Sequence, residues 1–371
     1  MKKLYFFIGT EAELMKMFRV IQEAKLRGYE CKIVSNGQND IKHSYYLSLV
    51  GGKIDVDLTK MMPGQKTAKN YLKWFIKTEK LGVKVMRREK ERCCGDLVMI
   101  VHGDTLSTLM GSRIARKCGI RYMHVESGLR SFNWLSPFPE EIDRYFSSKY
   151  SVMNFCQKAE AAEFASKTFK GKAVNTVYNT GIEILNNALT QIEEANMESP
   201  VKGKYFLTAI HRQENLMNSR FMKNTFEKIF EMSQNMKCVF IYHIQTEDAL
   251  KKFGLWDKFE ECPNIIKIPR QDYISFINYV INSEFVMADG CGNQQEFYYL
   301  GQPYLIMRTE VEEDSEGIGW NALCFKGNYD LISEFANNYK NYKKPRVVPE
   351  KLPSNIIMDA IDEYFGKLDE K

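Results

Sequence analysis

The 371-residue sequence predicts an α/β protein built from two doubly wound, Rossmann-like domains that face one another across a cleft. Three observations support this prediction. Short apolar runs rich in β-formers alternate with stretches of helical periodicity. That rhythm is interrupted once, by a polar, proline-containing stretch at 193–203, and then restarts. A chain of this length can also bury two separate hydrophobic cores.

The first half contains strands separated by helical patterns. Residues Leu14, Met17, Phe18 and Ile21 recur at helical spacing, which predicts a helix after the first strand. The expected strands are Lys3–Ile8, Glu30–Val34, Asp96–Val101, Arg121–Val125 and Val152–Phe155. Two more helices are expected at about Ser107–Lys117 and Ala159–Phe169.

The second half repeats the pattern. The expected strands are Lys204–Ala209, Val239–His243, Ile265–Ile268, Glu284–Ala288 and Pro303–Met307. Helices are expected over Phe221–Met232, from Asn293, and over Asn355–Leu368 at the end. The stretch Pro345–Pro353 is expected to return this last helix to the first domain. The predicted domains are therefore residues 1–190 with helix 354–371, and residues 191–353.

Composition excludes several classes of protein. No apolar run approaches the roughly 20 residues of a membrane helix. The nine cysteines form no CxxC pair, and no Cys or His residues have ligand spacing, which favours reduced thiols over disulfides or a metal site. The net charge of +5 is small, and the basic stretch 77–92 also holds three glutamates, which is typical of a solvated helix. We expect a cytoplasmic protein with no metal, nucleic-acid or membrane partner.

Histidines and carboxylates gather where strands end. His102, His124, His211 and His243 all lie at or just past an expected strand end, the edge where doubly wound sheets bind ligands. Asp104 follows a strand and could cap the next helix, unless Thr105 serves as the cap and leaves it free. Glu126 also ends a strand, and either has a direct role or is simply the partner of Arg130.

A helix entry and a glycine-rich turn supply further candidates. Pro137 and Pro139 precede Glu140, in the first helical turn, and Arg144 one turn later is expected to reach back to it. Gly290, Cys291 and Gly292 lie between a strand and a helix, where exposed N–H groups suit a phosphate. Glu296 lies one turn into that helix, placed to bind ribose hydroxyls.

The first strand leads into Gly9-Thr10-Glu11-Ala12-Glu13, which contains neither a dinucleotide fingerprint nor a phosphate-binding lysine loop. We therefore expect no cofactor, and chemistry performed by side chains.

Five motifs together resemble the bacterial UDP-N-acetylglucosamine 2-epimerases. They are His-Gly-Asp-Thr at 102–105, His-Val-Glu-Ser-Gly-Leu-Arg at 124–130, Pro-Phe-Pro-Glu-Glu-Ile-Asp-Arg at 137–144, His-Arg-Gln-Glu-Asn at 211–215 and Asp-Gly-Cys-Gly-Asn-Gln-Gln-Glu at 289–296. The resemblance spans roughly residues 4 to 325. It implies a GT-B-like arrangement of the two domains, a homodimer and a UDP-sugar substrate. It also implies a reaction in which UDP is eliminated across C1–C2 and added back with C2 inverted.

The resemblance also implies roles for individual residues. Acid/base chemistry and charge stabilisation would fall to Asp104, Glu126, Glu140, His211 and Arg144. Substrate binding would fall to Lys16, Arg130, His243, Gly290, Cys291, Gly292, Glu296 and Arg308.

The sequence departs from the family around the nucleotide, which keeps other functions open. Glu11 stands where the family has a phosphate-facing arginine, so UDP retention is expected to be weaker. A hydrolysing 2-epimerase, which releases N-acetylmannosamine and UDP, is one alternative. A glycosyltransferase with this fold, using a UDP-sugar, is another, and a non-catalytic sensor of sugar nucleotides is a third.

Overall fold

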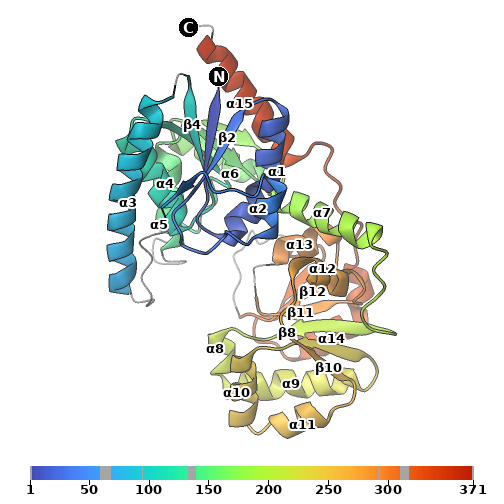
Figure 1. Ribbon diagram of the computed structural model, residues 1–371. Helices are drawn as coiled ribbons and strands as arrows, with labels where there is room; N and C mark the ends of the chain where they lie inside the picture. Colours follow the sequence, from blue (N-terminus) through green and yellow to red (C-terminus); the bar gives the residue numbers. More distant parts are fainter. Residues whose placement is uncertain are drawn as a thin grey trace. The chain divides into compact units, whose positions relative to one another are not determined.

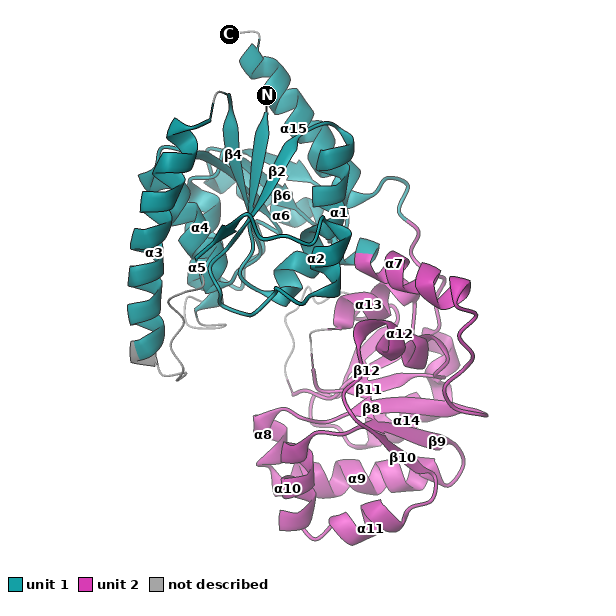
Figure 2. Ribbon diagram, viewed as in Figure 1, with its two compact units in different colours: residues 1–183, 349–371 teal, residues 184–348 magenta. Residues whose placement is uncertain are grey.

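The structure is a computed structural model that describes residues 2–58, 68–93, 95–132, 139–290, 293–309 and 317–369. The chain divides into two compact units, residues 1–183 with 349–371 (unit 1) and residues 184–348 (unit 2) (Figure 2). The division falls inside helix α7 (Gly181–Glu194), which is continuous across it. The sequence places the boundary later, at 190.

Unit 1 is built on a parallel sheet of seven strands in the order β3-β2-β1-β4-β5-β6-β7 (Figure 1). The strands are β1 (Lys3–Phe7), β2 (Glu30–Ser35), β3 (Val56–Asp57), β4 (Leu97–His102), β5 (Arg121–Val125), β6 (Met153–Cys156) and β7 (Lys172–Asn175). The chain winds in opposite directions from the neighbouring strands β1 and β4. The loops that follow these two strands therefore diverge, which opens the usual binding position at the carboxyl edge of such a sheet.

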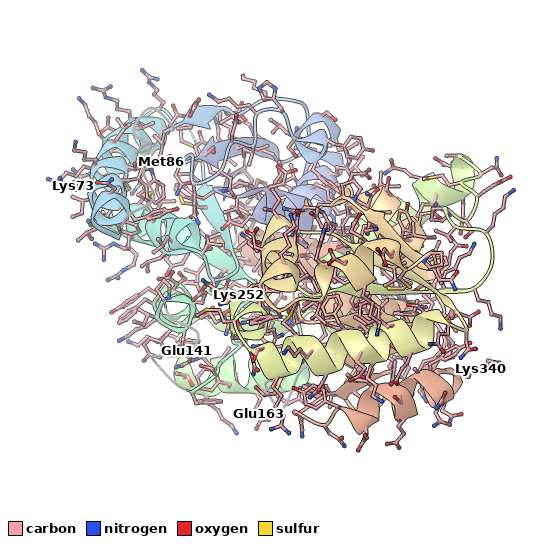
Figure 3. The ribbon with its side chains drawn as sticks, turned by 90° about the horizontal axis from the view of Figure 1, so that it is seen from below. Lys73, Met86, Glu141, Glu163, Lys252 and Lys340 are labelled. Atoms are coloured by element: carbon pink, nitrogen blue, oxygen red, sulfur yellow. The ribbon has the colours of Figure 1, made fainter. Side chains whose placement is uncertain are left out.

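The helices of unit 1 cover both faces of this sheet. They are α1 (Glu11–Leu26), α2 (Tyr45–Leu49), α3 (Ala68–Glu91), α4 (Leu106–Lys117), α5 (Glu140–Lys149), α6 (Ala159–Thr168) and α15 (Pro353–Asp369). On α3, Met86 is buried against the core whereas Lys73 is exposed (Figure 3). This helix therefore has the apolar face and solvated face that its sequence predicts.

The last helix packs on the first one. The rings of Tyr29 and Phe365 lie 5.6 Å apart, and Nη1 of Arg27 lies 2.7 Å from both Asp359 and Asp362. Helix α15 thus returns to unit 1 and packs beside α1 (Figure 1).

Unit 2 has a parallel sheet of six strands in the order β10-β9-β8-β11-β12-β13. The strands are β8 (Tyr205–Ala209), β9 (Lys237–Ile241), β10 (Ile265–Ile268), β11 (Val286–Ala288), β12 (Tyr304–Ile306) and β13 (Ala322–Cys324). Here β8 and β11 are the neighbours from which the chain winds in opposite directions. Each unit is therefore a Rossmann-like domain, as the sequence predicts.

The helices of unit 2 enclose an aromatic core. They are α8 (Gln213–Leu216), α9 (Ser219–Ser233), α10 (Ile244–Lys252), α11 (Trp256–Glu261), α12 (Tyr273–Ile281), α13 (Gln294–Leu300), α14 (Asp330–Asn338) and the 3₁₀ turn η2 (Tyr339–Tyr342). Phe206 and Phe285 stack under α9 and α14 with their rings 5.2 Å apart, and Phe297 packs on Tyr304 at 4.7 Å.

The strands expected from the sequence are confirmed to within two residues, whereas the short edge strands β3, β7 and β13 were not predicted. No helix in the described ranges is both long and apolar enough to cross a membrane.

Candidate active site

Glu126 is a carboxylate of unit 1 with two basic partners. It follows β5 with a φ of 62°, a left-handed conformation that is strained for a residue with a side chain. Its oxygens accept hydrogen bonds from Nζ of Lys16 at 2.8 and 3.1 Å, and Nε2 of His102 lies 3.1 Å from its Oε2. Burial alone would raise the pKa of this carboxyl, but Lys16 and His102 bring it well below the usual range. Glu126 is therefore ionised at neutral pH.

Three elements bring this group together. Lys16 lies on α1, which follows β1, His102 ends β4, and Glu126 follows β5. The strands β1, β4 and β5 are neighbours in the sheet. The suggestion that Arg130 is the partner of Glu126 is wrong, because Lys16 and His102 occupy that position.

Asp104 is free to form an ion pair because Thr105 caps helix α4. The Thr105 hydroxyl accepts hydrogen bonds from the N–H groups of Ser107 and Thr108. Nε and Nη2 of Arg144 each lie 2.8 Å from Oδ2 of Asp104. The expectation that Arg144 reaches back to Glu140 is corrected: the guanidinium pairs with Asp104, and its Nη1 lies 3.8 Å from Oε2 of Glu141.

Glu141, which was not predicted, anchors helix α5. Its side chain is fully buried, and it accepts hydrogen bonds from Nε of Arg130 at 2.5 Å and from the N–H of Ser131 at 3.1 Å. Figure 3 labels Glu141 on this helix. The Arg130 guanidinium also lies 5.1 to 5.6 Å from the ring centres of Tyr145, Phe164 and Phe132. Such cation–π contacts fix the loop that follows β5.

Two further buried carboxyls belong to this region. Glu13 accepts hydrogen bonds from the N–H groups of Gly9 and Thr10 and from the Thr105 hydroxyl, and burial raises its pKa. It forms a capping box that fixes the turn between β1 and α1. Asp143 on α5 is only 2% exposed, and burial, with Asp104 and Glu140 nearby, raises its pKa to about 8. The sequence alone could not show that Glu13 and Asp143 are buried, because most acidic residues lie on the surface.

The remaining residues of interest in unit 1 have local partners. Glu11 accepts a hydrogen bond from the Ser44 hydroxyl at 2.6 Å. His124 is buried, with its ring nitrogens 3.0 Å from Oγ of Ser148 and 2.7 Å from the carbonyl of Gly103. Burial lowers its pKa to about 4, so His124 is a neutral structural residue. Pro137 and Phe138 lie outside the described residues.

In unit 2, Asp289 organises the loop that follows β8. It is fully buried after β11 and accepts hydrogen bonds from the N–H groups of His211 and Arg212 and from the amide of Asn215. Nδ1 of His211 lies 3.1 Å from its Oδ1. Burial by itself would raise the Asp289 pKa, but these contacts lower it. An ionised Asp289 thus directs Nδ1 of His211 inward.

His211 and His243 lie together, as the strand order predicts. Their rings stack with centres 4.8 Å apart, and burial and the neighbouring His211 lower the pKa of His243. The backbone of Gly290 passes against the His211 ring, so a Cβ at this position would lie 2.9 Å from Cε1 of His211. A side chain at residue 290 would therefore displace that ring.

The other predicted residues of unit 2 lie at the same edge of the sheet or close to it. Oε1 of Glu296, in the first turn of α13, is 3.4 Å from the hydroxyl of Tyr273. Arg308 follows β12, and its carbonyl accepts a hydrogen bond from the N–H of Lys326. Cys291 and Gly292 lie outside the described residues. In the part of the chain that the structure describes, no three His, Cys, Asp or Glu side chains gather as a metal site would require.

Comparison with known proteins gives consistent results over nearly the whole chain. A family model described as UDP-N-acetylglucosamine 2-epimerase matches residues 24–346. The UDP-N-acetylglucosamine 2-epimerase of Methanocaldococcus jannaschii is 28% identical over 363 residues, covering 92% of this chain and 94% of the relative. That of Bacillus subtilis is 28% identical over 360 residues, covering 93% and 90%. The solved structure of UDP-GlcNAc 2-epimerase from M. jannaschii has a TM-score of 0.78 at 25% identity, covering 98% of this chain and 100% of that one.

Proposed function

Because the chain belongs to the UDP-N-acetylglucosamine 2-epimerase family, we propose that it inverts C2 of a UDP-linked N-acetylamino sugar, with UDP-N-acetylglucosamine as the first candidate. The observation that carries this proposal is the cluster at the carboxyl edge of unit 1. There Glu126 is held by Lys16 and His102, and Asp104 is held by Arg144. Carboxyl groups with different partners can serve as base and acid in one reaction.

The proposed reaction has two halves. A base removes the proton from C2 while the bond between C1 and the UDP oxygen breaks, and UDP leaves with that electron pair. The product is a 2-acetamidoglucal. UDP then adds back at C1 while C2 receives a proton on its opposite face. We assign Asp104 as the base on one face, and Glu126 with Glu140 as the carboxyl groups that exchange the proton on the other. Arg144 holds Asp104 in position for this transfer.

We assign the nucleotide to the residues of unit 2. His211, fixed by Asp289, and the adjacent backbone of Gly290 suit the diphosphate, whose negative charge grows as UDP leaves. His243, Glu296 and Arg308 complete the proposed nucleotide-binding residues, and Lys16 and Arg130 remain on the sugar side. In this assignment Arg130 acts through Glu141, as a support for α5.

We further propose that the enzyme is a cytoplasmic homodimer. The seven cysteines described are all free, which fits a reducing compartment. Light scattering of the purified protein after gel filtration tests the dimer, and a monomer would contradict it.

Proton NMR in D2O with UDP-N-acetylglucosamine tests the function. Deuterium at C2 together with formation of UDP-N-acetylmannosamine is the expected result. Free N-acetylmannosamine and UDP would instead identify the hydrolysing reaction, which the carboxylate of Glu11 favours. No exchange with any of several UDP-amino sugars, while sugar is transferred to an acceptor, would identify a glycosyltransferase.

A further inference from the structure

Asp143 is a buried carboxyl group that the proposed reaction does not use. It lies in the first turns of α5, next to Arg144, and is 2% exposed. Its Oδ2 has no hydrogen-bond partner among the described residues. Glu141, two positions away on the same helix, is equally buried but accepts hydrogen bonds from Arg130 and Ser131. Buried polar atoms normally have such partners, so an unmatched carboxyl oxygen beside the proposed site needs an explanation.

The charges around Asp143 do not compensate a negative charge. The groups that act on it electrostatically are two acids, Asp104 from the turn after β4 and Glu140 from α5 itself. The nearest cation in sequence, Arg144, directs Nε and Nη2 to Asp104. Helix α4 packs on α5, but its Arg113 binds Glu79 of α3 and its Arg116 lies over the ring of Tyr150.

The strand behind this helix supplies no cation either. His124 of β5 contacts Ser148 and the carbonyl of Gly103 through its two ring nitrogens, and burial keeps it neutral by lowering its pKa to about 4. The result is that burial, followed by the charges of Asp104 and Glu140, raises the pKa of Asp143 to about 8. At pH 7 Asp143 is a neutral carboxylic acid beside a carboxylate that is paired with arginine.

We propose that Asp143 is a positioning residue of this site, which must keep its proton so that no additional negative charge faces the Asp104–Arg144 pair. This inference rests on the proposed function. If Asp143 loses its proton, a further negative charge lies beside Asp104 and Glu140. This charge repels the carboxyl groups of Asp104 and Glu140 and so disturbs the arrangement that Arg144 holds. The activity therefore falls when Asp143 ionises, although Asp143 itself takes no proton from the sugar.

Asp143→Asn tests this role, because asparagine has the same shape and cannot ionise. The measurement is kcat/KM for the epimerisation from pH 6 to pH 10, for the wild type and the variant. We expect the wild type to lose activity with an apparent pKa near 8. We expect Asp143→Asn to keep its activity at pH 7 within about threefold and to extend the plateau by at least one pH unit. The matched control is Glu163→Gln, an exposed acid on α6 (Figure 3), which should leave the alkaline limb unchanged.

Two results would overturn the proposal. One is an alkaline limb with the same midpoint in Asp143→Asn. The other is a loss of more than tenfold at pH 7 in a variant that melts like the wild type, which would mean that the proton itself is transferred.

Infrared difference spectra of the full-length protein provide a readout without substrate. The proposal predicts a carboxylic acid C=O band that is present at pH 7, is lost above pH 9 and is absent from Asp143→Asn. A wild-type spectrum without this band contradicts the proposal. If the wild type shows no C2 exchange at any pH, the proposed function fails, and this band still reports on Asp143.

Discussion

Nε and Nη2 of Arg144 both lie 2.8 Å from a single oxygen, Oδ2, of Asp104. The two residues come from different elements, the turn after β4 and helix α5, and Thr105 rather than Asp104 caps α4. The other oxygen of Asp104 remains available, and the side chain is about one-third exposed. A carboxylate held from one side and open on the other suits a general base.

We expect Asp104→Asn to abolish exchange of the C2 proton and to leave UDP binding within about threefold of the wild type. The amide cannot accept the proton, whereas the proposed nucleotide-binding residues belong to unit 2. Deuterium incorporation by NMR and titration calorimetry with UDP measure the two effects. Exchange at the parental rate would refute the assignment of Asp104 as the base.

Replacing Lys16 with methionine should move the acidic limb of the pH–activity profile to higher pH. The positive charge of Lys16 is the largest single cause that lowers the pKa of Glu126, and burial raises that pKa once the ammonium group is lost. Without Lys16, Glu126 would take up its proton at a higher pH than in the wild type. Arg19→Gln, on the exposed side of the same helix, is the control. An unchanged acidic limb in Lys16→Met would contradict the role of this pair.

Asp143→Asn should also stabilise the fold at alkaline pH. The folded-state pKa is raised from 3.8 to about 8, so between these values the folded protein binds a proton that the unfolded chain does not. The free energy of unfolding of the wild type should therefore fall as the pH rises through this range. We expect the variant to lack this contribution and to be more stable at pH 8 by about 1–3 kcal/mol, with little difference at pH 4. Urea unfolding at the two pH values measures it, and equal stabilities at pH 8 would argue against a buried proton.

We expect Asp289→Asn to weaken UDP binding about tenfold or more, which corresponds to about 1.4 kcal/mol. Asp289 accepts hydrogen bonds from two backbone N–H groups and from Asn215, and it directs Nδ1 of His211. An amide can replace only some of these contacts, because its NH2 group would face donors. Titration calorimetry measures the change, and circular dichroism verifies the fold. Unaltered UDP affinity would show that His211 does not contact the nucleotide.

Gly290→Ala should reduce UDP affinity without removing any charged group. The new Cβ would lie 2.9 Å from Cε1 of His211, so the ring has to move away from Asp289 or from His243. Gly366→Ala adds a Cβ in open space on α15 and is the matched control. If Gly290→Ala binds UDP as well as this control does, the position of the His211 ring is unimportant for binding.

The sequence predicted the two sheets because their central strands are continuous apolar runs flanked by helical periodicity. The edge strands β3 and β7 were missed because β3 has only two residues and β7 has no buried residue, so neither forms a clear apolar run. The capping of α4 by Thr105 was one of two alternatives, and the structure selects it.

The candidate residues were easier to predict than their partners. Asp104, Glu126 and Arg144 stand out because each lies at the end of a strand or in the first turns of a helix. Which cation binds which carboxylate depends on the distance between loops that are far apart in the sequence. For that reason the pairing of Arg130 with Glu141 was not foreseen. Asp143 was overlooked because its burial depends on which face of α5 is turned inward.

The left-handed backbone at Glu126 has a consequence for how this position can evolve. A glycine would adopt a φ of 62° with less strain, so Glu126→Gly would relax the turn after β5 while deleting the carboxylate that Lys16 and His102 hold. Selection for fold stability and selection for catalytic activity thus favour different residues at position 126. A lineage that lost the reaction would be free to drift toward glycine here, and the residue at this position in a distant relative would report whether catalysis has been retained.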